Sequence, residues 1–543
     1  MPTSLRAEAV TKAATGRALD ALAVVVLLLV AAIAAVSFRD YGLGWDDYLH
    51  FQYGGYLASL YASGFKDQRA FSFVNLYMYG GGYDLLSTFA GKILPFDAFA
   101  TRRLIGAAIG VVGLLATWRL GRRLGGPLAG LIALALLATC PLYYGHMFIN
   151  AKDGPFATTM VIALLGIVRA YEEYPSPTPA TVALCGIGIG LAVGTRVLGG
   201  FAVLNAFLPL ALVVPARSRV HGLRLALREC RQFLVPFIPG AVLAYLVMGL
   251  AWPWSVVAPL NPFRAAAYFS HFFEPPWRDL FAGHLIKVTQ MPRSYVPILA
   301  AVKLPELMLA LGLCGIAGAL IASADRGRGG PAGRRAALLA AALAPLLPIL
   351  VTIVVRPAMY NCIRHFVFIV PPLAVLGGLA AMWIVRRLEG YGSAAMAAVA
   401  MVLVVGLASP IVEMVRLHPY EYTYYNRFVG GVPGARKLFM VDYWGLSLTQ
   451  AARELHARIA PSSRIRRLAV CGPHPPVRIA MGPGYTTTWK PERADFALVL
   501  GEHFCAKLDA PVLLKIVQEG VVYARVYDLR GRSISTSLLA PEP

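Results

Sequence analysis

Two short acidic motifs carry the residues whose types best suit chemistry. Residues 44–48 (GWDDY) and 150–155 (NAKDGP) each follow a long apolar segment. A carboxylate close to a bilayer is costly unless it faces water, a partner or a substrate. The two motifs therefore indicate a functional site at the edge of a membrane.

In the first motif, Asp46 and Asp47 are adjacent carboxylates. Neighbouring carboxylates raise each other's pKa, which suits one of them as a general base, and carboxylate oxygens also suit a divalent cation. The alternative is a solvated turn beside Trp45 and Tyr48, aromatic residues typical of any membrane interface. Both interpretations stay open, with Asp46 and Asp47 as candidate catalytic residues.

In the second motif, Asp153 stands where a later apolar segment begins. An aspartate at a helix start can serve as a cap that the helix dipole favours. The predicted topology, described below, also places it on the same side of the membrane as Asp46 and Asp47. Asp153 is therefore a third candidate catalytic residue. A divalent cation is left open, with any of these three carboxylates as its ligands.

The elements that must position these motifs are transmembrane helices. The chain has 543 residues, 58% hydrophobic and 14% charged, with a mean hydropathy of +0.62. Runs of roughly twenty apolar residues have the length that spans a bilayer. We predict a mainly α polytopic membrane protein with about eleven spans, at roughly 20–38, 103–120, 126–146, 156–171, 180–196, 198–215, 233–252, 296–321, 336–355, 365–385 and 393–412.

The net charge of +22 follows from the topology rather than from nucleic-acid binding. Arginines gather in alternate short loops, at 119–123, 217–231, 326–335 and 386–387. The positive-inside rule then makes these loops and the N-terminus cytoplasmic. The basic residues do not form one surface interleaved with aromatic residues, as a nucleic-acid interface would.

The opposite, external side collects the longer segments. Residues 39–102 and 252–295 form external loops within a membrane domain that we place at 1–412. From 413 to 543 the apolar runs shorten to strand length, at 468–471, 496–500 and 521–526, with a helical stretch at 448–459. This pattern predicts a small external α/β domain of about 130 residues, which is large enough to bury its own core.

Seven cysteines are scattered through the chain, and five of them lie in or beside apolar spans. The remaining two, Cys471 and Cys505, share the predicted external domain. They could form a disulfide if that compartment is oxidising.

Further candidates for substrate binding lie on the external side. Arg356, Arg364 and His365 flank the turn before the tenth predicted span. The guanidinium groups of the two arginines could bind a phosphate through paired hydrogen bonds, or could only extend toward the interface. Lys152, next to Asp153, and Tyr295, in the second external loop, add polar groups.

Taken together, the motifs resemble those of the GT-C superfamily of polytopic glycosyltransferases. The resemblance is carried by the Asp-Asp after the first span, by the Lys-Asp-Gly-Pro that opens the fourth, and by two longer stretches at 276–297 and 418–445. It extends over nearly the whole chain. The pattern is similar to the group that includes protein O-mannosyltransferases and aminoarabinose transferases, in a bacterial subfamily.

The resemblance implies transfer of a sugar from a polyprenyl-phosphate carrier to an acceptor hydroxyl or amine on the external face of a bacterial inner membrane. The carboxylate of Asp46 or Asp47 would be the general base. Lys152, Arg356 and Arg364 would stabilise the leaving phosphate. The acceptor, whether glycan, lipid or protein, is not identified by the sequence.

The external domain is expected to contribute to acceptor binding. Tyr422, Asn426, Asp442 and Trp444 combine aromatic faces with polar groups, as carbohydrate sites do. An aromatic hinge that packs this domain onto the membrane portion is an equal alternative.

Two rival functions remain at this stage. A multi-span transporter or flippase also carries charges among apolar spans. However, the sequence shows no inverted repeat, and its polar groups collect on one face rather than at the midplane. A non-catalytic subunit for envelope assembly is the second rival.

Overall fold

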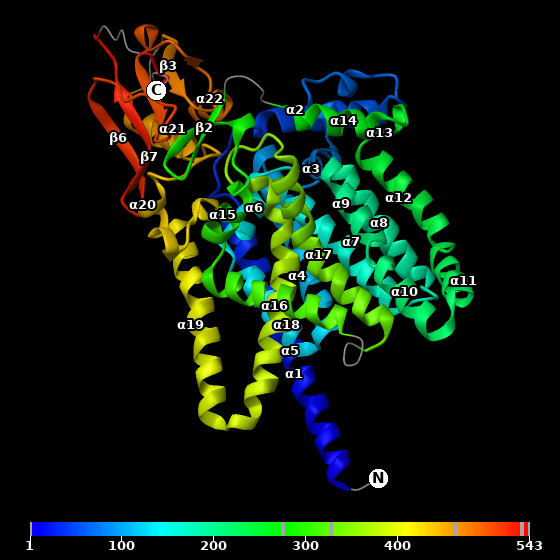
Figure 1. The fold of residues 1–543 in the computed structure, drawn as a ribbon. Coiled ribbons are helices and arrows are strands. Elements are labelled where there is room, and N and C mark those ends of the chain that lie inside the picture. The colour runs from blue at the N-terminus through cyan, green and yellow to red at the C-terminus, as the bar shows by residue number, and fades with distance from the viewer. Residues whose placement is uncertain (1–2, 273–276, 326–329, 461–463, 533–536, 541–543) are drawn as a thin grey trace.

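The fold is a helical bundle with a small α/β domain at one end (Figure 1). The computed structural model describes residues 3–272, 277–325, 330–460, 464–532 and 537–540. Pro276, at the start of the 276–297 stretch, and residues 326–329 of the arginine-rich loop lie outside this description.

Apolar helices make up the bundle. Within the described residues, nine helical segments are long and apolar enough to cross a membrane. They are α1 (apolar over Ala14–Ser37), α4 (Ala98–Gly125), α7 (Asp153–Glu172), Val197–His221 with α9 (Gly200–Phe207) and α10 (Leu210–His221), Leu223–Ala251 with α11 (Leu223–Leu234) and α12 (Phe237–Ala251), α16 (Glu306–Ala324), α17 (Ala332–Val355), Arg364–Tyr391 with α18 (Val370–Leu388), and α19 (Ser393–Leu417).

Two further apolar elements correspond to the two remaining predicted spans, 126–146 and 180–196. The pair α5 (Pro127–Ala138) and α6 (Pro141–Ile149) is bent by 62°, and α8 (Pro179–Thr195) is shorter. The prediction of a mainly helical membrane protein is confirmed.

Proline explains where the structure departs from the predicted spans. The segment predicted as one span at 296–321 is two helices, α15 (Tyr295–Lys303) and α16. Pro305 disfavours helical backbone in the preceding residue, and Leu304 is extended. The bend between α5 and α6 likewise falls before a proline, Pro141.

Short elements inside the predicted external loops lie across one end of the bundle (Figure 1). They are α2 (Asp47–Ala62), α3 (Gly82–Ala90), α13 (Trp254–Val257), α14 (Asn261–Ser270) and a hairpin of β1 (Arg278–Phe281) and β2 (His284–Lys287). The sequence predicted only loops here. These elements cover the end of the bundle on which the C-terminal domain sits.

The C-terminal domain follows α19, which ends at Leu417, beyond the predicted limit at 412. Its five-stranded sheet has the order β4-β3-β5-β7-β6. The strands are β3 (Arg466–Cys471), β4 (Tyr485–Thr488), β5 (Phe496–Leu500), β6 (Val512–Gln518) and β7 (Val521–Asp528). β3 pairs in parallel with β4 and β5, whereas β7 runs antiparallel to β5 and β6. Its helices are α20 (Gly431–Ala435), α21 (Ser447–Arg458) and α22 (His474–Met481).

Glycines let the bundle helices approach closely. A Cβ at Gly315 of α16 would lie 2.0 Å from the carbonyl oxygen of Leu376 in α18, and one at Gly188 of α8 would lie 2.7 Å from the Cα of Ala163 in α7. Small residues at such crossings allow the van der Waals contact that holds helices together in lipid.

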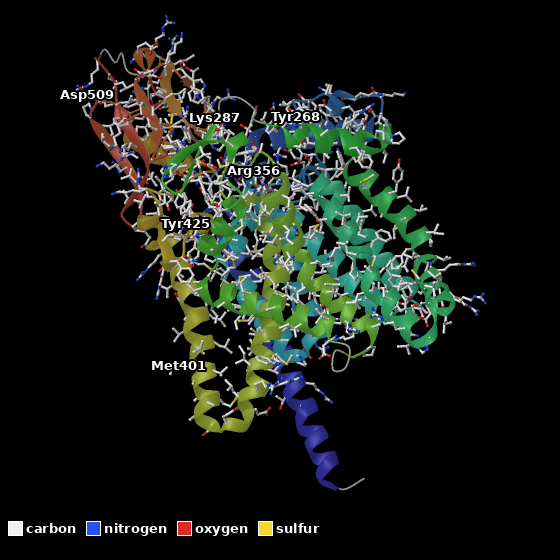
Figure 2. The ribbon with its side chains drawn as sticks, viewed as in Figure 1. Tyr268, Lys287, Arg356, Met401, Tyr425 and Asp509 are labelled. Atoms are coloured by element: carbon white, nitrogen blue, oxygen red, sulfur yellow. A yellow bond between two sulfur atoms is a disulfide. The ribbon has the colours of Figure 1, made fainter. Side chains whose placement is uncertain are left out.

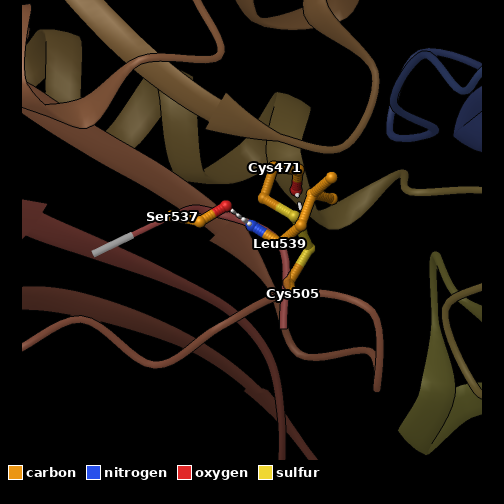
Figure 3. The surroundings of a disulfide bond; sticks show 4 residues. All are labelled: Cys471, Cys505, Ser537 and Leu539. Atoms are coloured by element: carbon orange, nitrogen blue, oxygen red, sulfur yellow. Dashed lines mark hydrogen bonds between the residues drawn. A yellow bond between two sulfur atoms is a disulfide. The ribbon is translucent and has the colours of Figure 1, made fainter. Parts of the chain in front are cut away.

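A disulfide joins Cys471, at the end of β3, to Cys505, in the loop after β5 (Figure 3). Their Cα atoms are 5.9 Å apart. The pairing hypothesised from the sequence is therefore present in the structure.

Candidate functional site

Asp46 lies just before α2 and faces a buried lysine. Its Oδ2 is 3.5 Å from Nζ of Lys152, and its side chain is 32% exposed. Lys152 is buried, with Nζ 4.3 Å from the ring centre of Tyr79. The ring and the carboxylate together hold the ammonium group in place.

Asp153 begins α7 with its carboxylate free of any capping role. The N-cap residue of α7 is Lys152, whose side chain makes no capping hydrogen bond, and Asn150 holds the turn before the helix, because its Oδ1 accepts hydrogen bonds from the backbone N–H groups of Lys152 (2.7 Å) and Asp153 (2.8 Å). The Asp153 carboxylate forms ion pairs with Arg196 and, at 3.4 Å, with Arg364. The Asp153 side chain therefore makes no capping hydrogen bond to α7.

These contacts define a charged cluster at the end of the bundle nearest the C-terminal domain. It comprises Asp46, Lys152, Asp153, Arg196 and Arg364. The side chains come from four separate parts of the sequence. Three cations face two carboxylates, so one positive charge remains. Such a site favours an anionic ligand.

The cluster determines the charge state of Asp46. Burial alone would raise the pKa of this carboxyl, but the positive charges of Lys152 and Arg364 outweigh it and hold the pKa below its usual value of 3.8. Asp46 is therefore ionised at neutral pH.

Asp47 is held in a different way. Its side chain is only 5% exposed and accepts two hydrogen bonds from Arg103, at 2.8 and 2.9 Å. The backbone N–H of Gly44 donates a third, at 2.6 Å. Asp47 thus fixes the first loop onto α4, whereas Asp46 keeps an accessible carboxylate.

An apolar groove of about 380 Å³ leads from the cluster. Arg196, Tyr79 and His365 line its polar part. The rest is lined by apolar side chains of α9, α14 and the end of α17, among them Leu204 and Val355, which are 52% and 64% exposed. The groove therefore combines a charged part with apolar walls that reach the surface of the bundle.

Two other predicted residues lie in local contacts outside the cluster. Arg356, labelled in Figure 2, donates to the backbone carbonyls of Met291 and Gln290. Tyr295 is buried and donates to Oδ2 of Asp279 at 2.9 Å.

The candidates in the C-terminal segment mostly serve its packing. Asn426 donates through Nδ2 to the carbonyls of Ala301 (2.6 Å) and Leu304 (2.9 Å), across the break before α16. Asp442 accepts from the Tyr422 hydroxyl and from backbone N–H groups at the start of α21. These contacts favour the hinge interpretation for all three side chains.

Trp444, by contrast, reaches the charged cluster. The guanidinium carbon of Arg364 lies 4.9 Å from its ring centre. Its carbonyl accepts from the backbone N–H of Trp45 at 3.2 Å. A Cβ at Gly44 would lie 2.0 Å from the Trp444 ring, so only glycine fits there. The C-terminal domain thus touches the first acidic motif directly.

Sequence reasoning missed Arg196 and Tyr79. Arg196 is the last residue of the predicted span 180–196, at its external end and next to the start of the span at 198–215. An arginine in an otherwise apolar run indicates a functional site. The predicted topology also placed Arg196 on the same side of the membrane as Asp153. Tyr79 carried no comparable signal among the many aromatic residues of the first loop.

His50, which follows Asp46 by one helical turn, belongs to a second buried network. Its Nδ1 is 2.7 Å from Oδ2 of Asp84, whose other oxygen pairs with Arg102. All three side chains are buried. This network fastens α2 to α3 and α4, and so helps to fix the position of Asp46.

Comparison with known proteins finds a family model that matches part of the chain. Residues 84–252 match a family model described as dolichyl-phosphate-mannose-protein mannosyltransferase. The matched part contains Lys152, Asp153 and Arg196. No curated relative matches the sequence at a significant level.

Solved structures of similar fold include ArnT from Cupriavidus metallidurans in the apo state, with a TM-score of 0.50 and 16% identity, covering 98% of this chain and 100% of that one. The same protein bound to undecaprenyl phosphate gives a TM-score of 0.48 with 16% identity, covering 96% and 99%.

The oligosaccharyltransferase of Archaeoglobus fulgidus gives a TM-score of 0.45 with 15% identity; the match covers 83% of this chain but only 62% of that longer protein. The chain therefore shares its fold with apo ArnT, and part of it, residues 84–252, is similar to the mannosyltransferase family.

Proposed function

We propose that the protein transfers a sugar from a polyprenyl-phosphate-linked donor to an acceptor hydroxyl or amine on the external face of the membrane. The observation that carries this proposal is a charged cluster with one excess positive charge beside an apolar groove. The matched family, named for transfer of mannose from dolichyl phosphate, supports a donor of this kind.

The groove and the cluster suit the two parts of such a donor. A polyprenyl tail is apolar and would lie along the groove walls. Its phosphate would lie near Arg196 and Arg364, whose guanidinium groups can each make paired hydrogen bonds to it. Lys152 adds a further positive charge.

In the proposed reaction the acceptor oxygen or nitrogen forms a bond to the anomeric carbon of the sugar. The bond from that carbon to the phosphate oxygen breaks, and the carrier leaves as a phosphate with one more negative charge. Arg196, Arg364 and Lys152 would stabilise this developing charge. Asp46 would accept the proton of the acceptor, because it is ionised and partly exposed.

We further propose that the protein lies in a bacterial inner membrane with the charged cluster and the domain at 413–543 outside. The arginines at 119–123 and 386–387, predicted to lie in loops, stand instead near the C-terminal ends of the helices α4 and α18, the ends that are far from Arg103 and Arg364. This distribution of arginines supports a cytoplasmic assignment for those ends. The external domain would then meet the acceptor beside Trp444.

The test is to incubate the purified protein in sealed vesicles with a lipid-linked sugar and candidate acceptors. Release of polyprenyl phosphate together with a modified acceptor supports the proposal. Movement of the intact donor across the membrane without bond cleavage would establish a flippase instead. If neither occurs with any lipid-linked sugar, an assembly role replaces the transferase.

One prediction concerns the pH dependence of turnover. Lys152 lowers the pKa of Asp46, so Lys152→Met raises that pKa. Since Asp46 acts in its ionised form, activity is lost as pH falls through this pKa. We expect the acid limb of the kcat/KM profile to move to higher pH in Lys152→Met. The exposed Lys66, in the same loop region as Asp46, gives the control variant Lys66→Met, whose limb stays in place. An unmoved limb in Lys152→Met contradicts the assignment of Asp46.

A second prediction concerns divalent cations. Among the residues that the structure describes, no group of three or more His, Cys, Asp or Glu side chains is placed to hold a metal. Each candidate carboxylate instead lies beside a basic side chain, which occupies the position that a cation would take. The site therefore does not fit a divalent cation, and we expect transfer to continue at an unchanged rate in EDTA. A loss of activity that added Mg²⁺ or Mn²⁺ restores would contradict this.

A further inference from the structure

A second cavity, of about 220 Å³, lies at one edge of the C-terminal sheet. It is formed where β5 ends, at Gly501–His503, and where the antiparallel β7 begins, at Val521–Tyr523. Arg436, which follows α20, closes another side. We call this cavity the sheet-edge pocket. In sheets with parallel strands, ligands bind outside the carboxyl ends of those strands, and β5 ends here.

Positive charge dominates the sheet-edge pocket. Its lining includes Arg436, Lys507 and Arg525 against a single carboxylate, Glu502. The Arg436 guanidinium donates to the carbonyls of Val522 (3.0 Å) and Gly501 (3.1 Å), neither of which carries charge. Within the described part of the chain, Lys507 and Arg525 form no ion pair. The pocket therefore holds cations that no neighbouring side chain neutralises.

Glu502 offsets little of this charge. Its Oε1 accepts from the backbone N–H groups of Asp442 (2.7 Å) and Val441 (3.1 Å), which fixes it at the pocket wall. Burial, and then the charge of Asp442, raise the pKa of Glu502 to about 7. A substantial fraction of this carboxyl is thus protonated at neutral pH.

The disulfide braces the loop after β5, which supplies five of the thirteen residues that line the pocket. Cys505 lines the pocket itself, and its bond to Cys471 ties the loop after β5 to the end of β3 (Figure 3). Glu502 and Lys507 lie on either side of this link. A loop that is already held in one arrangement loses less conformational entropy when a ligand binds. A preorganised binding site has this property.

We propose that the sheet-edge pocket binds one anionic group, a phosphate or a carboxylate, carried on a ligand of about the size of one sugar. The volume corresponds to about seven water molecules at about 30 Å³ each, which suits a single sugar ring rather than a longer glycan. This pocket shares no lining residue with the charged cluster or the apolar groove. The proposal concerns binding alone and does not rest on the transfer reaction.

The test titrates the full-length protein in nanodiscs with glucose 6-phosphate, glucuronate and glucose at constant ionic strength. We expect saturable binding of at least one of the two anions and none of glucose. Loss of one charged hydrogen bond weakens binding about tenfold or more, and we expect this for both Lys507→Ala and Arg525→Gln. Lys515→Ala removes an exposed cation on β6 outside the pocket and should leave the affinity unchanged.

Each outcome decides the proposal. Binding of only the phosphate, or only the carboxylate, identifies the ligand class, and equal binding of both marks a general anion site. Binding that persists unchanged in Lys507→Ala and Arg525→Gln places the anion elsewhere, for instance at the charged cluster, and overturns the proposal. Absence of saturable binding overturns it too. If Arg525→Gln fails to fold, Lys507→Ala decides alone, because its side chain is exposed.

Discussion

Replacing Asp46 by asparagine is expected to lower kcat about 10²–10⁴-fold, the usual contribution of a positioned general base. The amide keeps the size of the side chain but cannot accept the acceptor's proton. Because Asp46 is partly exposed and its ion pair with Lys152 spans 3.5 Å, we expect the thermal unfolding temperature to stay close to that of the unmodified protein.

The measurement is turnover of a lipid-linked sugar by protein in defined vesicles, with thermal unfolding followed in parallel. Asp67→Asn is the matched control, because Asp67 is a carboxylate of the same loop region that pairs with the exposed Arg69. We expect that variant to retain full activity. Full activity in Asp46→Asn would remove Asp46 from the role of base, and equal losses in both variants would point to a general effect on the loop.

The bundle could be predicted from sequence because each membrane span leaves a long apolar run. The break at Leu304 and Pro305 was missed, although Pro305 lies between the charged Lys303 and Glu306, because the prediction joined the apolar runs beyond these residues into one span. The short helices α2, α3 and α14 were also missed. They lie across the end of the bundle, where no continuous apolar stretch marks a helix.

The C-terminal domain was predicted from short apolar runs between turn signals. The runs at 468–471, 496–500 and 521–526 fall within β3, β5 and β7. The outer strands β4 and β6 were missed because they carry fewer buried side chains, as edge strands usually do. The order of the strands depends on pairings between distant segments, which no local pattern contains.

The site was only partly accessible from sequence. Asp46 and Asp47 are adjacent, so their residue types cannot tell which one faces the cluster. The distinction depends on Arg103, 56 residues away from Asp47, and on Lys152. Likewise, the polar groups of Tyr422 and Asp442 suited a carbohydrate site, but they bond to each other at the start of α21. The sequence identifies side chains that are able to do chemistry. Only the packing shows which of them are not already bonded to other parts of the protein.

The two carboxylates of the first motif thus illustrate two solutions to one problem. A charge at the membrane edge must be compensated. Asp47 is compensated by buried hydrogen bonds to Arg103, whereas Asp46 is compensated by a lysine at longer distance and by partial exposure. The hydrogen bonds of Asp47 fix the position of the first loop. The looser contact of Asp46 leaves one of its carboxylate oxygens accessible to a substrate.

This difference leads to the second large expected effect, which is on stability. Asp47→Ala leaves the guanidinium of Arg103 buried with the carbonyl of Gly42 as its remaining partner. Breaking a buried ion pair by removing one partner costs about 3–5 kcal/mol. We therefore expect a marked fall in the thermal unfolding temperature and in the yield of folded protein, which Asp46→Asn does not cause.

A double variant separates this structural role from catalysis. Replacing both partners of a buried pair by apolar groups of similar size is often close to neutral. We therefore expect Asp47→Leu with Arg103→Met to recover most of the stability that Asp47→Ala loses, and with it measurable turnover, since Asp46 is still present. Unfolding temperatures and turnover of the two variants and the unmodified protein provide the comparison. If the double variant were stable but as inactive as Asp46→Asn, Asp47 would belong to the chemistry itself, because restored packing would not have restored function.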